Sequence, residues 1–119
     1  MAGADLSATD LRGSNLSRAF LINTILNGAD LSGARLYDAK LNNAQFRDAD
    51  LRDADLRDAD LSYTNLVATD LRGSNLTDAN LINANIIESN FTLAKVTQEQ
   101  LNQAYRLGGT TMPDGTFHP

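Results

Sequence analysis

The segment FRDADLRDADLRDAD, residues 46–60, repeats one five-residue phrase almost three times. The same register runs through most of the chain. Every fifth residue from Leu6 to Val96 is large and apolar, and the residue two places before each is small. The nineteen large residues are fifteen Leu with Phe46, Ile86, Phe91 and Val96, and the nineteen small ones are twelve Ala, four Thr and three Ser. An unbroken internal repeat of this kind decides the fold before any other feature does.

A period of five fits neither the 3.6 residues of a helical turn nor a long alternating strand. Large and small residues two apart point the same way only in extended backbone, so each unit predicts a three-residue strand followed by a two-residue turn. The second turn position is mostly Gly, Asn or Asp, which are the residues that favour turns or tolerate positive φ. The sequence therefore predicts an all-β fold. An all-α alternative would need apolar spacings of three and four, which are absent before residue 97.

The units of this repeat follow the pattern A(D/N)Lxx, as in Ala29-Asp30-Leu31, Ala54-Asp55-Leu56 and Ala79-Asn80-Leu81. The pattern resembles that of the pentapeptide-repeat family over roughly residues 4–96. The resemblance implies a right-handed quadrilateral parallel β-helix with four pentapeptides per coil, hence about five coils. At a strand spacing of ~4.8 Å the column would be ~24 Å tall.

A different segment begins where the repeat fails, at Thr97. Thr97 and Gln100 form a capping-box pattern, and Gly108 is a suitable stop, so we predict a short helix from Thr97 to near Arg106 that covers the last coil. A Pro113-Asp114-Gly115 turn should follow. The chain then divides into a β-helix, residues 1–96, and a C-terminal α-helical cap with its tail, residues 97–119. This ending resembles that of cyanobacterial and chloroplast members of the family.

Coils of twenty residues place acidic residues above one another. Asp10, Asp30, Asp50 and Asp70 form a ladder of like charges, which by itself destabilises neighbouring strands. Their predicted neighbours are Arg12, Arg52 and Arg72. We interpret this set as a structural charge ladder rather than a metal site, because three guanidinium groups occupy the place of a cation. The RDAD phrases themselves fall on successive faces and form no single patch.

Composition narrows the classes of function. The chain has 119 residues, a net charge of −5, no Cys and one His, His118. We therefore predict one domain, no thiolate metal site, no cofactor and no catalytic residue, and hence no enzyme. No apolar run approaches a membrane span and no leader opens the chain, so we expect no membrane insertion. The chain as it stands indicates the cytoplasm; the thylakoid lumen or periplasm is the alternative if a leader was removed.

The family resemblance raises one alternative function, since some acidic members imitate duplex DNA and bind type II topoisomerases such as gyrase. DNA carries about one charge per ~1.7 Å, so a ~24 Å column would need a net charge of about −14. The net charge here is −5. The sequence therefore favours a non-enzymatic structural or protein-interaction module, with no nucleic acid as partner.

Outward apolar residues supply the candidate contact. Phe20, Ile22 and Ile25 lie in the stretch from Ser14 to Gly28, where Arg18 is the one charged residue. Depleted charge around an aromatic side chain is typical of an interface core. We predict a protein partner or a weak homodimer through these amino-terminal coils, at an end with no cap of its own. Val67 and Ile87 also point outward, near Ile82. Scattered exposed apolar residues occur in any protein, so an ordinary surface remains the alternative.

Overall fold

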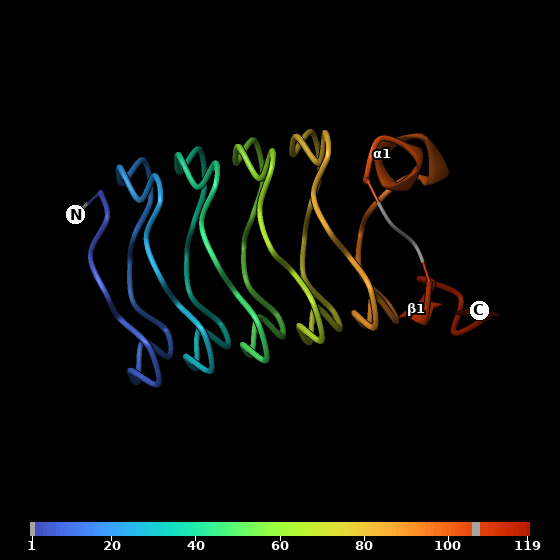
Figure 1. The fold of residues 1–119 in the computed structure, drawn as a ribbon, viewed down its shortest axis with the longest axis horizontal. Helices are drawn as coiled ribbons and strands as arrows, with labels where there is room; N and C mark the ends of the chain where they lie inside the picture. Colours follow the sequence, from blue (N-terminus) through green and yellow to red (C-terminus); the bar gives the residue numbers. More distant parts are fainter. Residues whose placement is uncertain (1, 106–107) are drawn as a thin grey trace.

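The computed structural model describes residues 2–105 and 108–119, and in it the chain winds into a stacked column (Figure 1). The two termini lie at opposite ends of the column, whose extents are 34 × 24 × 22 Å. Parallel bridges join residues twenty apart, such as Asp10 with Asp30 and Asp30 with Asp50. The repeat register is thus converted directly into stacking, because four units of five residues bring the chain back above its own start.

Each coil has four outward-pointing bridge residues, one on each of the four faces of the column. We call these residues rungs. The first face contains rungs 5, 25, 45, 65 and 85, and the second contains rungs 10, 30, 50, 70 and 90. The third face contains rungs 15, 35, 55, 75 and 95, and the fourth contains rungs 20, 40, 60 and 80. A two-residue turn separates successive faces. The predicted ladder Asp10, Asp30, Asp50 and Asp70 therefore follows the second face.

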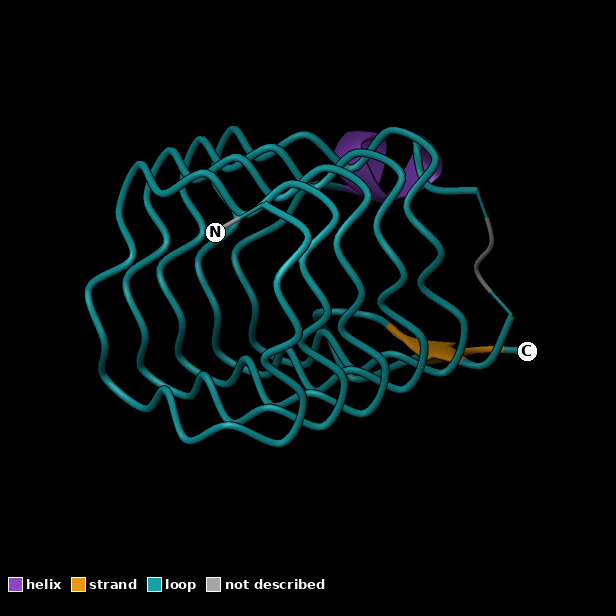
Figure 2. Ribbon diagram, turned by 60° about the vertical axis from the view of Figure 1, so that its left-hand side comes forward, coloured by secondary structure: helices purple, strands orange, loops and turns teal. Residues whose placement is uncertain are grey.

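The predicted three-residue strands are present only as single paired residues. Leu11 donates its N–H to the Asp30 carbonyl (2.7 Å), and Asp30 donates to the Thr9 carbonyl (3.0 Å). Because the chain turns after three residues, only these two bonds fit on each rung. Within the described residues, the strands longer than one residue are β1, Thr110–Thr111, and β2, Phe117–His118, which pair antiparallel (Figure 2).

The turns confirm the expected positive φ. Every second turn position from Gly3 to Leu93 has φ between 55° and 73°. From Thr9 to Ala94, the N–H after each turn bonds back three residues, as from Ser14 to the Leu11 carbonyl (3.1 Å). Tyr63, Glu88 and Leu93 adopt this conformation although such residues seldom do. The stacking of each turn on the next, as in the bond from Tyr63 N–H to the Ile82 carbonyl (2.9 Å), holds them there.

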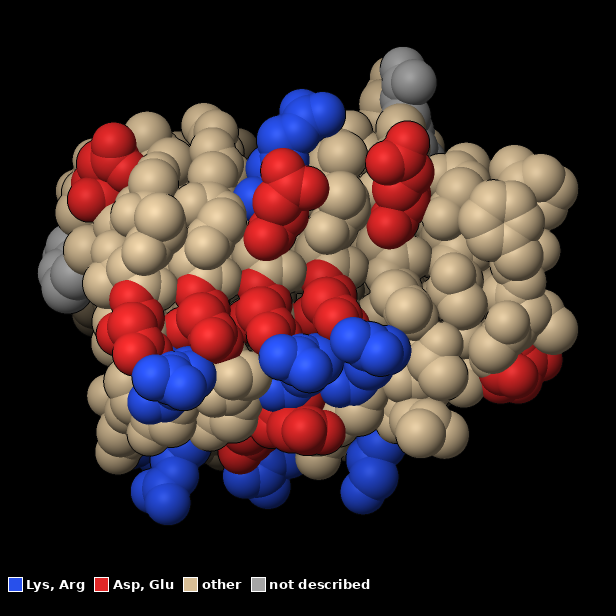
Figure 3. Space-filling view, turned by 90° about the horizontal axis from the view of Figure 1, so that it is seen from below, with Lys and Arg blue, Asp and Glu red and all other residues tan. Residues whose placement is uncertain are grey.

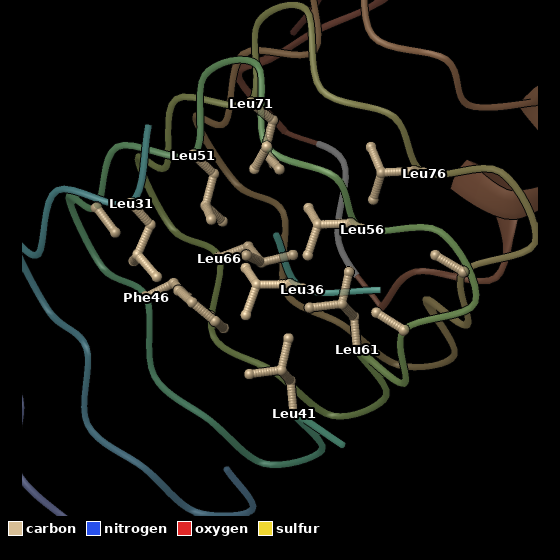
Figure 4. Packing of buried hydrophobic residues seen from close by; sticks show 14 of the residues in the cluster. Leu31, Leu36, Leu41, Phe46, Leu51, Leu56, Leu61, Leu66, Leu71 and Leu76 are labelled. Atoms are coloured by element: carbon tan, nitrogen blue, oxygen red, sulfur yellow. The ribbon is translucent and has the colours of Figure 1, made fainter. Parts of the chain in front are cut away.

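The interior is lined by the large residues of the repeat (Figure 4). Leu31, Leu51 and Leu71 are fully buried and stack on one side, as the twenty-residue register predicts. Small hydroxyl residues of the repeat bond to nearby backbone: Thr64 Oγ1 donates to the Leu61 carbonyl (2.7 Å) and Ser74 Oγ to that of Leu71 (2.6 Å). Buried hydroxyl groups are thus paired inside an otherwise apolar core.

The C-terminal helix is shorter than predicted. α1 spans Gln98–Asn102 and begins with the expected capping box of Thr97 and Gln100, but it ends before the predicted limit near Arg106. The chain leaves the helix because its backbone pairs with the coil below. Gln103 accepts from Asn83 N–H (2.9 Å), and Tyr105 donates to the Ala84 carbonyl (2.9 Å). Arg106 and Leu107 lie outside the described residues.

The tail adds rungs that the sequence did not predict. Tyr105 repeats on Ala84 the bond that Asn85 makes one coil earlier, and Thr111 pairs in parallel with Asn90. Tyr105 thereby prolongs the first face of the column, and Thr111 prolongs the second. The predicted turn after Met112 is confirmed by Gly115, which has φ 86° and donates to the Met112 carbonyl (2.9 Å).

Candidate functional site

The outward Asp and Asn residues of the repeat hold the turns that follow them. In each such unit the side-chain Oδ1 accepts the N–H of the residue two places on, as from Arg52 to Asp50 (3.0 Å) and from Val67 to Asn65 (3.0 Å). The thirteen rungs that make this bond are Asp5, Asp10, Asn15, Asp30, Asp50, Asp55, Asp60, Asn65, Asp70, Asn75, Asn80, Asn85 and Asn90. They are all the Asp and Asn rungs from residue 5 to 95. The last aspartate of each RDAD segment therefore serves first to hold the turn that follows it.

The charge ladder is built on these rungs, and it appears as a row of acidic groups with basic groups beside it (Figure 3). Arg12, Arg52 and Arg72 each bond the aspartate of their own rung, with Nη2–Oδ2 distances of 2.8, 2.6 and 2.6 Å. Two of them also reach the next coil: Arg12 Nε lies 3.9 Å from Asp30 Oδ2, and Arg52 Nε lies 3.8 Å from Asp70 Oδ2. The arginines thus tie rungs together along the second face.

Electrostatics follow from these bonds. The hydrogen bond from the Arg12 guanidinium lowers the pKa of Asp10 to about 2, and the bond from Arg52 lowers the pKa of Asp50. Asp50 in turn raises the pKa of Arg52. Each of these two carboxylates therefore has its own cationic neighbour. Within residues 2–105 and 108–119, no group of three or more His, Asp or Glu could hold a metal ion, and no helix is long and apolar enough to cross a membrane.

The amino-terminal apolar cluster, which is Phe20, Ile22 and Ile25, wraps around one corner of the column. Phe20 is a rung of the fourth face and is 67% exposed; Ile25 is a half-buried rung of the first face. Ile22, also half-buried, lies in the turn between them. The three residues are neighbours in the chain, but they present themselves on two adjacent faces.

The same part of the chain departs from the turn-forming rule, by which an Asp or Asn rung accepts the N–H of the residue two places on. Of the rungs from 20 to 45, Asp30 alone is Asp or Asn; the others are Phe20, Ile25, Arg35, Lys40 and Gln45. Phe20 and Ile25 have no side-chain acceptor for the following N–H. At Gln45 the bond comes from elsewhere, since Asn27 Oδ1 accepts from Arg47 N–H (2.9 Å). The fold therefore tolerates these residues but does not require them.

One arrangement on the surface was missed by sequence reasoning. The guanidinium carbons of Arg18 and Arg57 lie 5.9 and 5.3 Å from the centre of the Tyr37 ring, within the range of a cation–π contact. Tyr37 and Arg57 are twenty residues apart, so the coil register contains the signal. Val67, expected on the surface, is only 9% exposed, whereas Tyr63, Ile82 and Tyr105 are 58%, 43% and 64% exposed.

Comparisons with known proteins agree with this architecture. The profile of the family described as Pentapeptide repeats matches in eight copies over residues 4–43, 14–53, 39–78 and 54–92. Among solved structures, a pentapeptide repeat protein from the thylakoid lumen of Arabidopsis thaliana is 35% identical, with a TM-score of 0.68 over 82% of this chain and 72% of the other. A comparison with curated protein sequences found no match.

Two further solved structures share the fold. The pentapeptide repeat protein Rfr23 from the cyanobacterium Cyanothece 51142 is 26% identical, with a TM-score of 0.66 over 92% of this chain and 84% of the other. QnrB1, a plasmid-mediated fluoroquinolone resistance protein, is 17% identical, with a TM-score of 0.58 over 89% of this chain but only 59% of the other. At that identity QnrB1 shows the fold alone. These neighbours imply a right-handed quadrilateral β-helix.

Proposed function

This chain belongs to the pentapeptide-repeat family, and on that premise we propose that it is a non-enzymatic protein-interaction module. Its contact surface includes the amino-terminal apolar cluster. Pentapeptide-repeat proteins are generally structural or interaction modules, and the rung side chains of the repeat here form four outer faces. Such faces suit recognition of another macromolecule better than enclosure of a substrate.

One observation carries the proposal: Phe20 is 67% exposed at a rung where Asp or Asn would hold the turn. The Asp and Asn rungs all make that bond, and each such bond contributes about 0.5–1.5 kcal/mol. An aromatic ring in its place cannot accept the N–H of the turn, and most of its surface is open to solvent. Aromatic residues are enriched in interface cores, where they supply much of the binding energy.

The experiment is affinity capture from a lysate of the organism that encodes the protein. The wild-type chain should retain a partner that the Phe20→Ser/Ile22→Ser variant loses. Leu93→Ser is the matched control, because Leu93 is 79% exposed in a turn between the second and third faces. A partner lost equally with Leu93→Ser, or held equally by all three proteins, would refute a contact at the cluster.

Mimicry of DNA, the alternative function, is less well supported. The net charge is −5, about a third of what five coils, ~24 Å tall, would need at the charge density of the duplex. The acidic row of the second face is also neutralised locally by Arg12, Arg52 and Arg72. We expect the purified protein to leave gyrase supercoiling unchanged, and potent inhibition would reverse this choice.

We also propose that residues 97–119 form a cap over the column of residues 1–96. Leu101 is 1% exposed, and Gln100 Nε2 donates to the carbonyls of Leu76 (2.7 Å) and Ala79 (3.0 Å). Deleting residues 97–119 would leave the last rungs unpaired, and unpaired edges promote aggregation. A truncated chain as soluble and as stable as the intact one would contradict the cap.

The compartment is a further proposal. We favour the cytoplasm for the chain as it stands, with the thylakoid lumen or periplasm as the alternative, which the lumenal Arabidopsis relative supports. Fractionation of cells that express the protein from its own gene, followed by immunodetection, distinguishes the two.

A further inference from the structure

The four faces of the column differ sharply in charge. The second face carries the charge ladder, the third includes Arg35, Asp55 and Lys95, and the fourth includes Lys40 and Asp60. The rungs of the first face are Asp5, Ile25, Gln45, Asn65 and Asn85, and Tyr105 prolongs them. Beyond Asp5, this face has no charged rung among the described residues.

Among residues 2–105, the corner between the fourth and first faces carries no charged turn residue. Its turn residues from one coil to the next are Ile22 with Asn23, Asn42 with Asn43, Ser62 with Tyr63, and Ile82 with Asn83. Among the described turn residues that flank the first face, the charged ones are on its other corner, at Arg47, Asp48 and Glu88. Ile22 and Ile25 of the amino-terminal apolar cluster are thus one end of a much longer uncharged surface, which we call the neutral face: the first face together with the corner between the fourth and first faces. Phe20, on the fourth face, lies outside it.

Apolar side chains gather toward the two ends of the neutral face, and amides lie between them. Ile22 and Ile25 are near the amino-terminal end; Ile82, 43% exposed, and Tyr105, 64% exposed, are near the other. Gln45 and Asn65 occupy the middle rungs. An amide side chain both donates and accepts hydrogen bonds, so amides can pair with amides of their own kind.

We propose that the neutral face binds a second copy of this chain, packed face to face and antiparallel about a two-fold axis. The proposal deepens the proposed function, because it rests on the chain being an interaction module and names one partner. With the axis midway between rungs 45 and 65, Gln45 of one copy faces Asn65 of the other and Ile25 faces Asn85. At the corner, Ile22 of one copy faces Ile82 of the other. A two-fold axis makes each of these contacts twice.

The distribution of charge favours contact between two neutral faces, and it favours the antiparallel register. With a net charge of −5, two copies repel each other, and contact through any other face would bring charged rows together. In the antiparallel register, Asp5 faces Tyr105, Arg47 faces Val67, and Glu88 faces Gly28. Asp48 likewise faces Ala68. No charge on either edge of the neutral face therefore meets a like charge, and the charged residues at the rim need not be fully desolvated.

The size of the face sets the expected strength. A face about as wide as the shortest extent of the molecule, 22 Å, and five coils tall at ~4.8 Å per coil has an area on the order of 500 Å². Two copies would bury about 1,000 Å² together, which is the lower limit for a specific contact. We therefore expect a reversible dimer that dissociates on dilution, not a permanent one.

Sedimentation equilibrium over a concentration series from micromolar to millimolar tests the proposal. The intact chain should dimerise at the upper end of the series. Ile22→Glu and Ile82→Arg should each raise the dissociation constant at least about tenfold, since each places an uncompensated charge in the contact. The double variant should recover most of the loss, because the glutamate introduced in one copy then faces the arginine introduced in the other, twice per dimer.

Ser17→Glu and Thr77→Arg are the matched controls. Ser17 and Thr77 are exposed first turn residues in the corner between the third and fourth faces, so their charges should leave the dissociation constant unchanged. Unfolding midpoints of all variants establish that each is folded. A monomer at millimolar concentration, or a dimer in which the double variant is no tighter than the single variants, would overturn the proposal. Either result leaves untouched the capture of a different partner through Phe20, which tests the proposed function separately.

Discussion

Two parts of the column have the same backbone and different outer rungs. Rungs 50 to 90 are all Asp or Asn, and each bonds to the turn after it. Rungs 20 to 45 include only one such residue, Asp30. Yet the ladder bonds have nearly the same lengths, 2.7 Å from Leu26 to Gln45 and 2.8 Å from Leu66 to Asn85.

The difference separates what builds the column from what decorates it. The stacked backbone and the buried Leu residues suffice for the geometry, since both parts share them. The side-chain bonds of Asp and Asn add local stability where nothing else is required of the rung. Where they are missing, as at Phe20 and Ile25, we infer that the outer residue is used for binding. Four experiments test this comparison.

Truncation of the core should have the largest effect, and the same effect in both parts. Leu36 and Leu76 are fully buried on the same side of the column, two coils apart. Leu36→Ala and Leu76→Ala should each lower the free energy of unfolding by about 2–5 kcal/mol, through lost burial and the cavity left behind. Urea denaturation measures both. A much smaller loss at Leu36 would mean that the two parts are not equally well packed.

Removal of a turn-forming rung should have a moderate effect, in one part only. Asn75 Oδ1 accepts from Thr77 N–H (3.1 Å), so Asn75→Ala should lower the free energy of unfolding by about 1 kcal/mol. Gln45 makes no such bond to its own turn, and its contact with Asn27 Nδ2 is long, 3.4 Å. Gln45→Ala should therefore be close to neutral. Equal losses at the two rungs would show that the side-chain bond is not the source of the difference.

Restoring the rule at Phe20 should exchange binding for stability. Phe20→Asn supplies an acceptor for Ile22 N–H, and because Phe20 is largely exposed, little burial is lost. We expect a gain of up to about 1 kcal/mol in the free energy of unfolding together with weaker partner capture. Asn80→Phe, on the same face, is the reciprocal control, since it removes a 3.0 Å bond to Ile82 N–H. Loss of stability in Phe20→Asn would mean that the ring supports the fold after all.

Acidification should have the smallest effect. The pKa of Asp10 is lowered to about 2 and that of Asp50 is also lowered, by the hydrogen bonds of Arg12 and Arg52. In the unfolded chain an aspartate titrates near ~3.9. The Asp10–Arg12 and Asp50–Arg52 pairs therefore stabilise the fold fully at pH values above the pKa of an unfolded aspartate, and this contribution is lost as the pH falls toward about 2. Arg52→Gln should flatten this part of the pH dependence of the unfolding midpoint. Arg47→Gln, outside the charge ladder, should leave it unchanged.

Much of this protein could be predicted from the repeat alone. Because no insertion interrupts the period of five, the positions of Leu31, Leu51 and Leu71, the positive φ of each second turn residue and the row of Asp10 above Asp30 all follow by counting. The sequence predicted a structural role for the ladder aspartates, but only through their charges. Their hydrogen bonds to the turn N–H groups became clear only from the structure. Phe20, Ile22 and Ile25 were found as exposed residues, without the corner that divides them between two faces.

The sequence by itself determined the column, because every contact in it repeats a local rule at a fixed spacing of twenty residues. The tertiary structure alone decided the features that obey no repeat. The last coil leaves backbone groups without partners, and these draw Gln103, Tyr105 and Thr111 onto it and end α1 at Asn102. The neutral face likewise exists only once four-sided stacking brings Ile22, Gln45 and Ile82 onto one side. Residues sixty positions apart become one surface through the geometry of the coil, and no short stretch of the chain contains that information.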